Sequence, residues 1–137
     1  MRALQYIQRF ALLVVFFSLT LGCGDANEYA TVPVSGIVTC NGKPVANGTI
    51  NFTPMADQGR SEGNRGRVAL GSTDKDGKFK LTTYQNDDGA IVGKHTVTIS
   101  AGFNEETGGS TDKSFSCAKS AKEVTVERGV KEYKIDF

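Results

Sequence analysis

The chain has 137 residues, of which 39% are hydrophobic and 23% are charged, and its 16 Lys and Arg residues nearly balance its 15 Asp and Glu residues. This length allows one domain, with or without a targeting segment, and the composition is that of an ordinary globular domain, which excludes a disordered tail and a multi-span membrane protein. The near-neutral charge leaves no basic footprint for nucleic acid, so no nucleic-acid partner is expected. One His and three Cys leave few side chains for a catalytic or metal centre.

The N-terminal segment has the layout of an export signal. Residues 1–9 carry two positive charges and no acidic group, and residues 10–21 are apolar except for Ser18 and Thr20. A helix of that apolar length rises about 18 Å, which is too short for the roughly 30 Å hydrocarbon core of a bilayer. The pattern therefore predicts a cleaved signal helix over residues 1–22 rather than a membrane span.

Gly22 and Cys23 follow the apolar run directly and precede a polar stretch. A small residue before a cysteine at this place resembles the lipobox of bacterial lipoproteins, in which the cysteine is diacylated and becomes the first residue of the mature chain. Leu19 lies one position further from the cysteine than the commonest pattern, and a conventional cut near Gly22 or Ala26, or an uncleaved anchor, is the alternative. The resemblance implies lipidation at Cys23, a tether over residues 23–31 and a membrane-anchored location in the cell envelope, at the outer membrane or cell surface.

The rest of the chain shows no sustained helical periodicity and instead alternates apolar and polar residues in short runs. Gly, Asn and Asp residues separate these runs, as expected of turns between strands. The seven expected strands cover residues 32–40, 49–54, 68–73, 78–83, 94–101, 123–127 and 131–137. Seven short strands with turns between them predict an all-β sandwich over residues 32–137.

Two turns carry specific expectations. The Asn-Gly pair at residues 41–42 predicts a type I′ turn, because that geometry needs a positive φ at both central positions. Residues 74–77 predict a hairpin turn between the two strands that flank them, with Phe79 and Leu81 pointing inward.

Three stretches of these strands carry a family resemblance: V-S-G-I-V-T-C-N-G-K-P-V-A-N-G-T-I-N-F over 34–52, T-D-K-D-G-K-F over 73–79, and G-K-H-T-V-T-I over 93–99. They resemble the carboxypeptidase regulatory-like (transthyretin-like) β-sandwich, with His95 at a position usually held by Tyr. The resemblance covers about residues 32–102. It implies a Greek-key sandwich that serves as a small accessory domain of secreted or surface proteins, without catalytic residues of its own. His95 is then expected as a half-buried strand residue.

Cys40 and Cys117 remain once Cys23 is lipidated. An even number of cysteines in an exported chain predicts a disulfide, which would tie the long loop before residue 117 to the sandwich. Two buried thiols are the alternative. These cysteines and the single His lack the close spacing of a zinc site, so no metal and no cofactor are expected.

Residues 55–67 form a polar, glycine-containing connector with Arg60, Arg65 and Arg67. Arginine suits carboxylate, phosphate and sulfate groups, and loops on a rigid scaffold often carry binding. The connector is therefore either a solvated loop or a recognition surface for an anionic envelope polymer or protein.

The expected function follows from these features. The transthyretin-like family also includes hydrolases of a urate-pathway intermediate, but those use several His and Arg residues and a tyrosine-rich C-terminal signature. This chain has one His, and no Ser, His and acidic group can be assembled around His95 from the spacing. We expect a lipid-anchored, non-enzymatic envelope sandwich with a structural or binding role. An anion-recognition module is the first alternative, and a hydrolase is the second.

Overall fold

The computed structural model describes residues 29–56, 63–101, 103–104, 109–110 and 116–137. The expected signal helix of residues 1–22, together with Cys23 and Arg60, lies outside these ranges. The described residues form an all-β structure with a short 3₁₀-helix. Its elements are β1 (Thr31–Val32), β2 (Ser35–Cys40), β3 (Lys43–Pro44), β4 (Thr49–Pro54), β5 (Ala69–Ser72), β6 (Lys78–Lys80), β7 (Ala90–Ile91), β8 (Gly93–Ser100), β9 (Phe103–Asn104), β10 (Gly109–Ser110), the 3₁₀-helix η2 (Ser116–Lys119), β11 (Ala121–Val126) and β12 (Glu132–Asp136).

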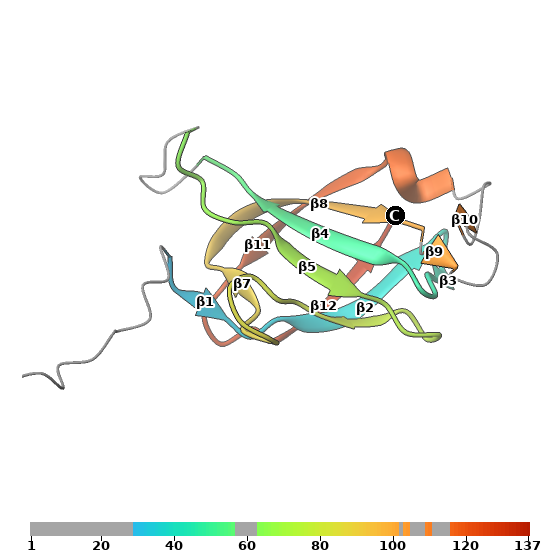
Figure 1. The fold of residues 1–137 in the computed structure, drawn as a ribbon, viewed down its shortest axis with the longest axis horizontal. Coiled ribbons are helices and arrows are strands. Elements are labelled where there is room, and N and C mark those ends of the chain that lie inside the picture. Colours follow the sequence, from blue (N-terminus) through green and yellow to red (C-terminus); the bar gives the residue numbers. More distant parts are fainter. Residues whose placement is uncertain (1–28, 57–62, 102, 105–108, 111–115) are drawn as a thin grey trace, which may run out of the picture.

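Two four-stranded sheets contain most of these strands. The first sheet is antiparallel and has the order β11-β8-β4-β5. In the second sheet β2 is central, with β12 parallel to it on one side and β3 and β6 antiparallel to it on the other. The strands of both sheets follow the long axis of the molecule, and the short pairs β1–β7 and β9–β10 lie near its two ends (Figure 1).

The inward faces of the two sheets share one hydrophobic core, which gives a sandwich-like arrangement. Phe52 on β4 lies against Phe79 on β6, with ring centroids 6.1 Å apart. Ile50 and Phe52 are fully buried, as the alternation in β4 predicts. The remaining buried hydrophobic residues of the core come from both sheets and their connections: Val34, Val38, Val45, Ala69, Leu81, Ala90, Val97, Ile99, Cys117, Val126 and Ile135.

The seven expected strands are all present, with shifts of a few residues at their ends. The first expected strand divides into β1 and β2, because Pro33 lacks the N–H that a continuous ladder needs. The Asn-Gly turn is confirmed: Asn41 and Gly42 have φ of 52° and 75°, and β2 and β3 pair on either side of them. Strands β3, β7, β9 and β10 were not expected, because two residues are too few to show a period.

The expected hairpin at residues 74–77 is only partly correct. Its two strands turn away from each other into different sheets, since β5 pairs with β4 whereas β6 pairs with β2. Backbone hydrogen bonds join them near the turn, from Asp74 N–H to Lys78 O (2.9 Å), and further along between Leu70 and Thr82 (2.9 and 2.8 Å). The turn is therefore a corner between the sheets.

Gly71 allows the two strands to come close at this corner. A Cβ at this position would lie 2.5 Å from the carbonyl oxygen of Lys80 and 3.1 Å from the side chain of Leu81. Phe79 and Leu81 are buried and the lysines beside them are exposed, as predicted.

A second corner joins the sheets at their other edge. Residues 127–131 lead from β11 in the first sheet to β12 in the second. The backbone N–H of Glu127 donates to the hydroxyl of Tyr133 (3.2 Å), which fixes the turn against the following strand. The chain thus connects the two sheets at both edges. Val126 and Ile135, which lie on either side of this second corner, are both buried in the shared core.

Candidate functional site

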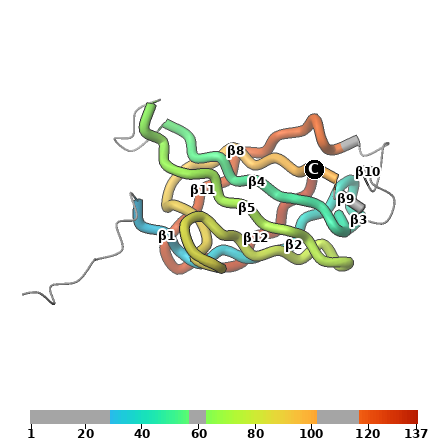
Figure 2. Tube along the Cα trace, in the orientation of Figure 1, coloured from blue at the N-terminus to red at the C-terminus, as the bar shows by residue number. Residues whose placement is uncertain are grey.

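The two ends of the molecule differ in what they contain. We term the end where the described chain begins the entry end; it consists of residues 29–32, 63–68, 90–94 and 127–131. We term the opposite end the disulfide end; it consists of residues 40–43, 74–77 and 116–119. Figure 1 shows the blue start of the described chain near β1 and β7 at one end and the C-terminus toward the other end, where β3 lies, and the trace in Figure 2 follows the same course.

A disulfide joins Cys40, the last residue of β2, to Cys117 on η2. Their Cα atoms lie 6.0 Å apart, and 77 positions separate them in the sequence. Cys117 is buried and belongs to the core. The predicted pairing is thus confirmed, and it ties the segment before β11 to the centre of the second sheet.

The end of β12 holds the Asn-Gly turn beside this disulfide. The Asp136 carboxylate accepts hydrogen bonds from the Thr39 hydroxyl (2.5 Å) and from the Gly42 N–H (3.0 Å). The backbone of Phe137 adds two bonds, donating to Thr39 O and accepting from Asn41 N–H, each at 2.9 Å. The first strand of the second sheet, its turn and its last strand therefore form one connected unit.

The arginine connector lies at the entry end. Arg65 and Arg67 are both exposed. Tyr29 donates a hydrogen bond from its hydroxyl to Asn64 O (2.9 Å), which fastens the connector to the start of the chain. Gly66, with φ of 88°, lies so close to Tyr29 and Ile91 that a Cβ would be 2.8 and 2.5 Å from their side chains.

The guanidinium of Arg67 lies over the ring of Tyr84, with 5.7 Å between Cζ and the ring centroid. This stacking restricts the arginine while leaving its N–H groups at the surface, where they can bind an anionic group. Arg65 and Arg67 both lie exposed in the connector, two positions apart, whereas Arg60, the third predicted residue, lies outside the described residues.

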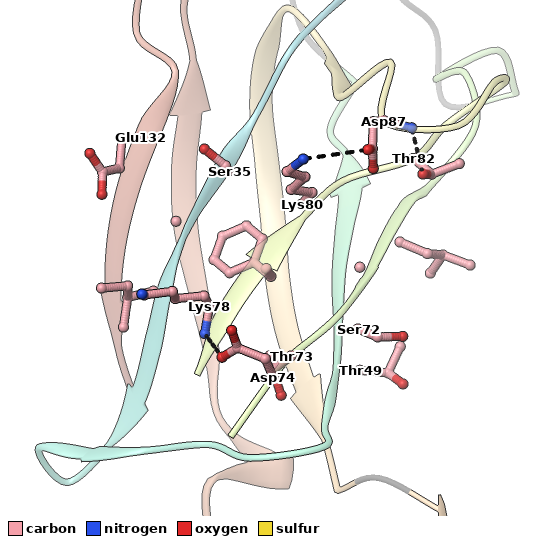
Figure 3. Close-up of a pocket in the computed structure, with 15 residues that line it drawn as sticks. Ser35, Thr49, Ser72, Thr73, Asp74, Lys78, Lys80, Thr82, Asp87 and Glu132 are labelled. Carbon is pink, nitrogen blue, oxygen red and sulfur yellow. Dashed lines mark hydrogen bonds and ion pairs between the residues drawn. The ribbon is translucent and has the colours of Figure 1, made fainter. Parts of the chain in front are cut away.

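An open groove of about 920 Å³ runs along the corner between β5 and β6. Figure 3 shows Thr49 and Ser72 on one side of it and Ser35, Lys78 and Glu132 on the other. Most of its lining surface is apolar, with Ile37, Leu70 and Phe79 among the lining residues, and hydroxyl groups and charges of both signs lie along its sides, so it can take a ligand that combines apolar and hydrogen-bonding groups. The sequence does not reveal this groove, because it exists only where β5 and β6 pair with different sheets.

The charged side chains around the groove also bind within the chain. Lys80 forms an exposed ion pair with Asp87 (3.6 Å). Asp74 accepts hydrogen bonds from the N–H groups of Asp76 (2.9 Å) and Lys78 (2.8 Å), which shape the turn at residues 74–77.

The single His of the chain is a core residue. His95 is fully buried, rather than half-buried as expected, because its ring fills the interior beside Phe52 at a centroid distance of 5.8 Å. Its Nδ1 lies 3.0 Å from Gly93 O. Within the described ranges, no group of three or more His, Cys, Asp or Glu side chains is placed to hold a metal ion. In the same ranges, no helix has the length and apolar character to cross a membrane.

Comparison with known proteins finds no counterpart: no family model, no curated protein and no solved structure matches the chain. The all-β arrangement and the Cys40–Cys117 pairing therefore rest on the structure itself. The resemblances to bacterial lipoproteins and to carboxypeptidase regulatory-like domains remain predictions from the sequence.

The disulfide gives a prediction about stability. In the chain-entropy model, replacing both Cys40 and Cys117 with Ser lowers the free energy of unfolding by about 4 kcal/mol, because the unfolded chain regains the freedom of a long loop. Urea denaturation of the variant and of the unchanged protein, each without reductant, measures the difference. Adding reductant to the unchanged protein should produce a similar loss, and a difference too small to resolve would contradict the prediction.

Asp136 gives a prediction about pH. Its pKa is lowered by the hydrogen bond from Thr39 and then by the N–H of Gly42; desolvation opposes this in part, and the nearby charge of Lys122 makes the smallest lowering contribution. Because the folded pKa lies below the unfolded one, the carboxylate stabilises the fold above about pH 4 and loses this effect as pH falls through the lowered pKa.

We expect Asp136→Asn, which keeps the shape but not the charge, to unfold at lower urea concentration at neutral pH. Its stability should also fall less than that of the unchanged protein between about pH 4 and pH 2. Urea titrations at the three pH values measure this, and equal acid-induced losses in the two proteins would show that the carboxylate does not act in this way.

Proposed function

We propose that the chain is an exported protein anchored in the bacterial cell envelope by lipid on Cys23, with a non-catalytic sandwich domain that has a structural or binding role. The observation that carries this proposal is the pairing of Cys40 with Cys117. The chain has three cysteines, so Cys23 is the one left over, and only Gly22 separates it from the short apolar run that predicts an export signal.

The disulfide also supports export. Structural disulfides persist in oxidising compartments outside the cytoplasm and are rare inside it. A bridge between a strand end and a buried cysteine of the core is of the structural kind. The compartment that the disulfide favours is thus the one to which the N-terminal signal would send the chain.

The entry of the chain into the domain supports an orientation for the anchored protein. Tyr29, which is bound to the connector through Asn64, lies six positions after Cys23. An extended chain of that length spans at most about 21 Å. The entry end would therefore face the membrane, and the disulfide end would point away from it.

The use of the polar side chains supports a role without catalysis. His95 is enclosed in the core. Asp88 accepts hydrogen bonds from the N–H groups of Thr83, Tyr84 and Gln85 at 2.7, 3.0 and 3.2 Å, so its carboxylate shapes a loop.

We extend the proposal to the fold family. The carboxypeptidase regulatory-like resemblance expects a strand that ends in an apolar residue, any residue and Phe, and the inward-facing Ile50 and Phe52 of β4 fall at these positions.

The intact mass of the protein from the membrane fraction tests the anchor. We expect a chain that begins at Cys23 and carries acyl groups, with two thiols that become available to alkylation only after reduction. The Cys40→Ser/Cys117→Ser variant should keep the acyl mass, whereas Cys23→Ser should lose it. A full-length unacylated mass, or a mass that begins at Ala26 or another conventional cut, would refute the proposal.

A second candidate is recognition of an anionic envelope polymer or protein by the connector. The stacking of Arg67 on Tyr84 favours it, because the stacked guanidinium keeps its N–H groups exposed and loses less freedom on binding.

Salt elution from immobilised heparin and polygalacturonate, as sulfated and carboxylated probes, tests this candidate. We expect Arg65→Gln/Arg67→Gln to elute at lower salt than the unchanged protein. Lys43→Gln/Lys75→Gln removes the same charge at the disulfide end and should elute close to the unchanged protein. Equal shifts in the two variants would mean that only net charge matters, and recognition by the connector would be abandoned.

A further inference from the structure

The sequence contains two Asn-Gly pairs, Asn41-Gly42 and Asn47-Gly48. Such pairs are the places where an asparagine side chain deamidates most readily, because a glycine without Cβ lets its backbone nitrogen reach the preceding side-chain amide. Both asparagines have the same φ of 52°. Their φ angles therefore do not distinguish the two pairs, which differ in what holds the glycine nitrogen and in how exposed the glycine is.

Asn47-Gly48 is held in place by hydrogen bonds to Thr73. The N–H of Gly48 donates to the Thr73 hydroxyl at 2.7 Å, in a buried position. The Gly48 carbonyl accepts the Thr73 N–H at 2.8 Å, and the Asn47 N–H donates to Thr73 O at 3.1 Å. Gly48 is itself buried, and a Cβ there would lie 2.9 Å from Ser100 O. The Gly48 nitrogen cannot move toward the Asn47 side chain without breaking buried hydrogen bonds.

The glycine nitrogen of Asn41-Gly42 is held by a surface hydrogen bond rather than a buried one. Both residues are exposed, and apart from Gly42 and its two neighbours in the chain no described atom lies within 4 Å of the position that a Gly42 Cβ would take. The N–H of Asn41 donates to Phe137 O at 2.9 Å, which holds the asparagine backbone, but the N–H of Gly42 donates to Asp136 at 3.0 Å in an exposed position. Water competes for this bond, so breaking it costs less than breaking the buried bonds at Gly48.

We propose that Asn41 is a site of spontaneous deamidation in the folded protein and that Asn47 is protected from it. The Gly42 nitrogen gives up its proton to solvent and attacks the side-chain amide carbon of Asn41, ammonia leaves, and a cyclic succinimide forms. Water then opens the ring on either side and gives aspartate or isoaspartate. Water is the only co-reactant, and nothing is oxidised or reduced.

The product changes the disulfide end. The new carboxylate at residue 41 lies in the same turn that Gly42 fastens to Asp136, so like charges come close together. Isoaspartate also adds a backbone atom to a turn whose two residues fit a type I′ geometry. The modification would therefore loosen β3 and the turn next to Cys40.

Peptide mapping by mass spectrometry after incubation at mildly alkaline pH tests the proposal. The full chain is incubated folded and, in parallel, in urea with its disulfide reduced. In urea both pairs are unstructured, and we expect them to deamidate at similar rates. In the folded chain we expect conversion at Asn41 severalfold faster than at Asn47. Equal folded rates, a faster rate at Asn47, or no conversion at Asn41 while the urea sample reacts would overturn the proposal.

Thr73→Val tests the cause of the protection, because valine keeps the shape and removes the hydroxyl that binds Gly48. We expect the folded variant to gain reactivity at Asn47 and to keep its rate at Asn41. Thr125→Val, on the exposed strand β11, is the matched control and should leave both rates unchanged. Unchanged protection of Asn47 in Thr73→Val would overturn the role given to the Thr73 hydroxyl.

Discussion

The packing of one sheet against the other is the interaction on which the rest of the molecule depends. Phe52 and Phe79 meet across the interface, and the two corners of the chain, at residues 74–77 and 127–131, close the core at its opposite edges. Because β5 and β6 belong to different sheets, the corner between them opens into the groove. Strands β11 and β12 also belong to different sheets, and the turn of the second corner, between them, lies at the entry end. The surfaces that can bind are thus consequences of how the core is enclosed.

Local pattern predicted which residues face inward but not which strands pair. Alternation correctly predicted that Phe79 and Leu81 point inward, and the Asn-Gly pair at residues 41–42 correctly predicted its turn, since both depend on neighbours along the chain. The disulfide was predicted by counting the cysteines of a chain that was expected to be exported. The parallel pairing of β12 with β2, the divergence of β5 from β6 and the groove between them depend on contacts between distant segments. The depth of His95 was misjudged for the same reason: its burial is set by Phe52 on another strand.

The two ends of the molecule are under different constraints. The entry end combines the start of the chain with exposed arginines, and Tyr29 binds these two features together. The disulfide end combines the covalent bridge with the Thr39, Gly42 and Asp136 network. If lipid holds the chain at Cys23, the end that meets the membrane is a polar connector, and the end exposed to the surroundings is the cross-linked one. A cross-link at the exposed end limits fraying and access to proteases where the domain is least shielded.

The parallel pairing of β2 with β12 also sets the order in which the chain can fold. Ser35 pairs with Glu132 and Thr39 with Asp136, so almost the whole domain lies between partners that become neighbours. Contacts between such distant segments form late and slowly, because a long loop must close first. If the chain is exported as proposed, with its N-terminus leading, β2 crosses the membrane early and β12 last. The second sheet would then be completed only after the final strand had crossed, so this part of the fold would not obstruct transport while it is under way.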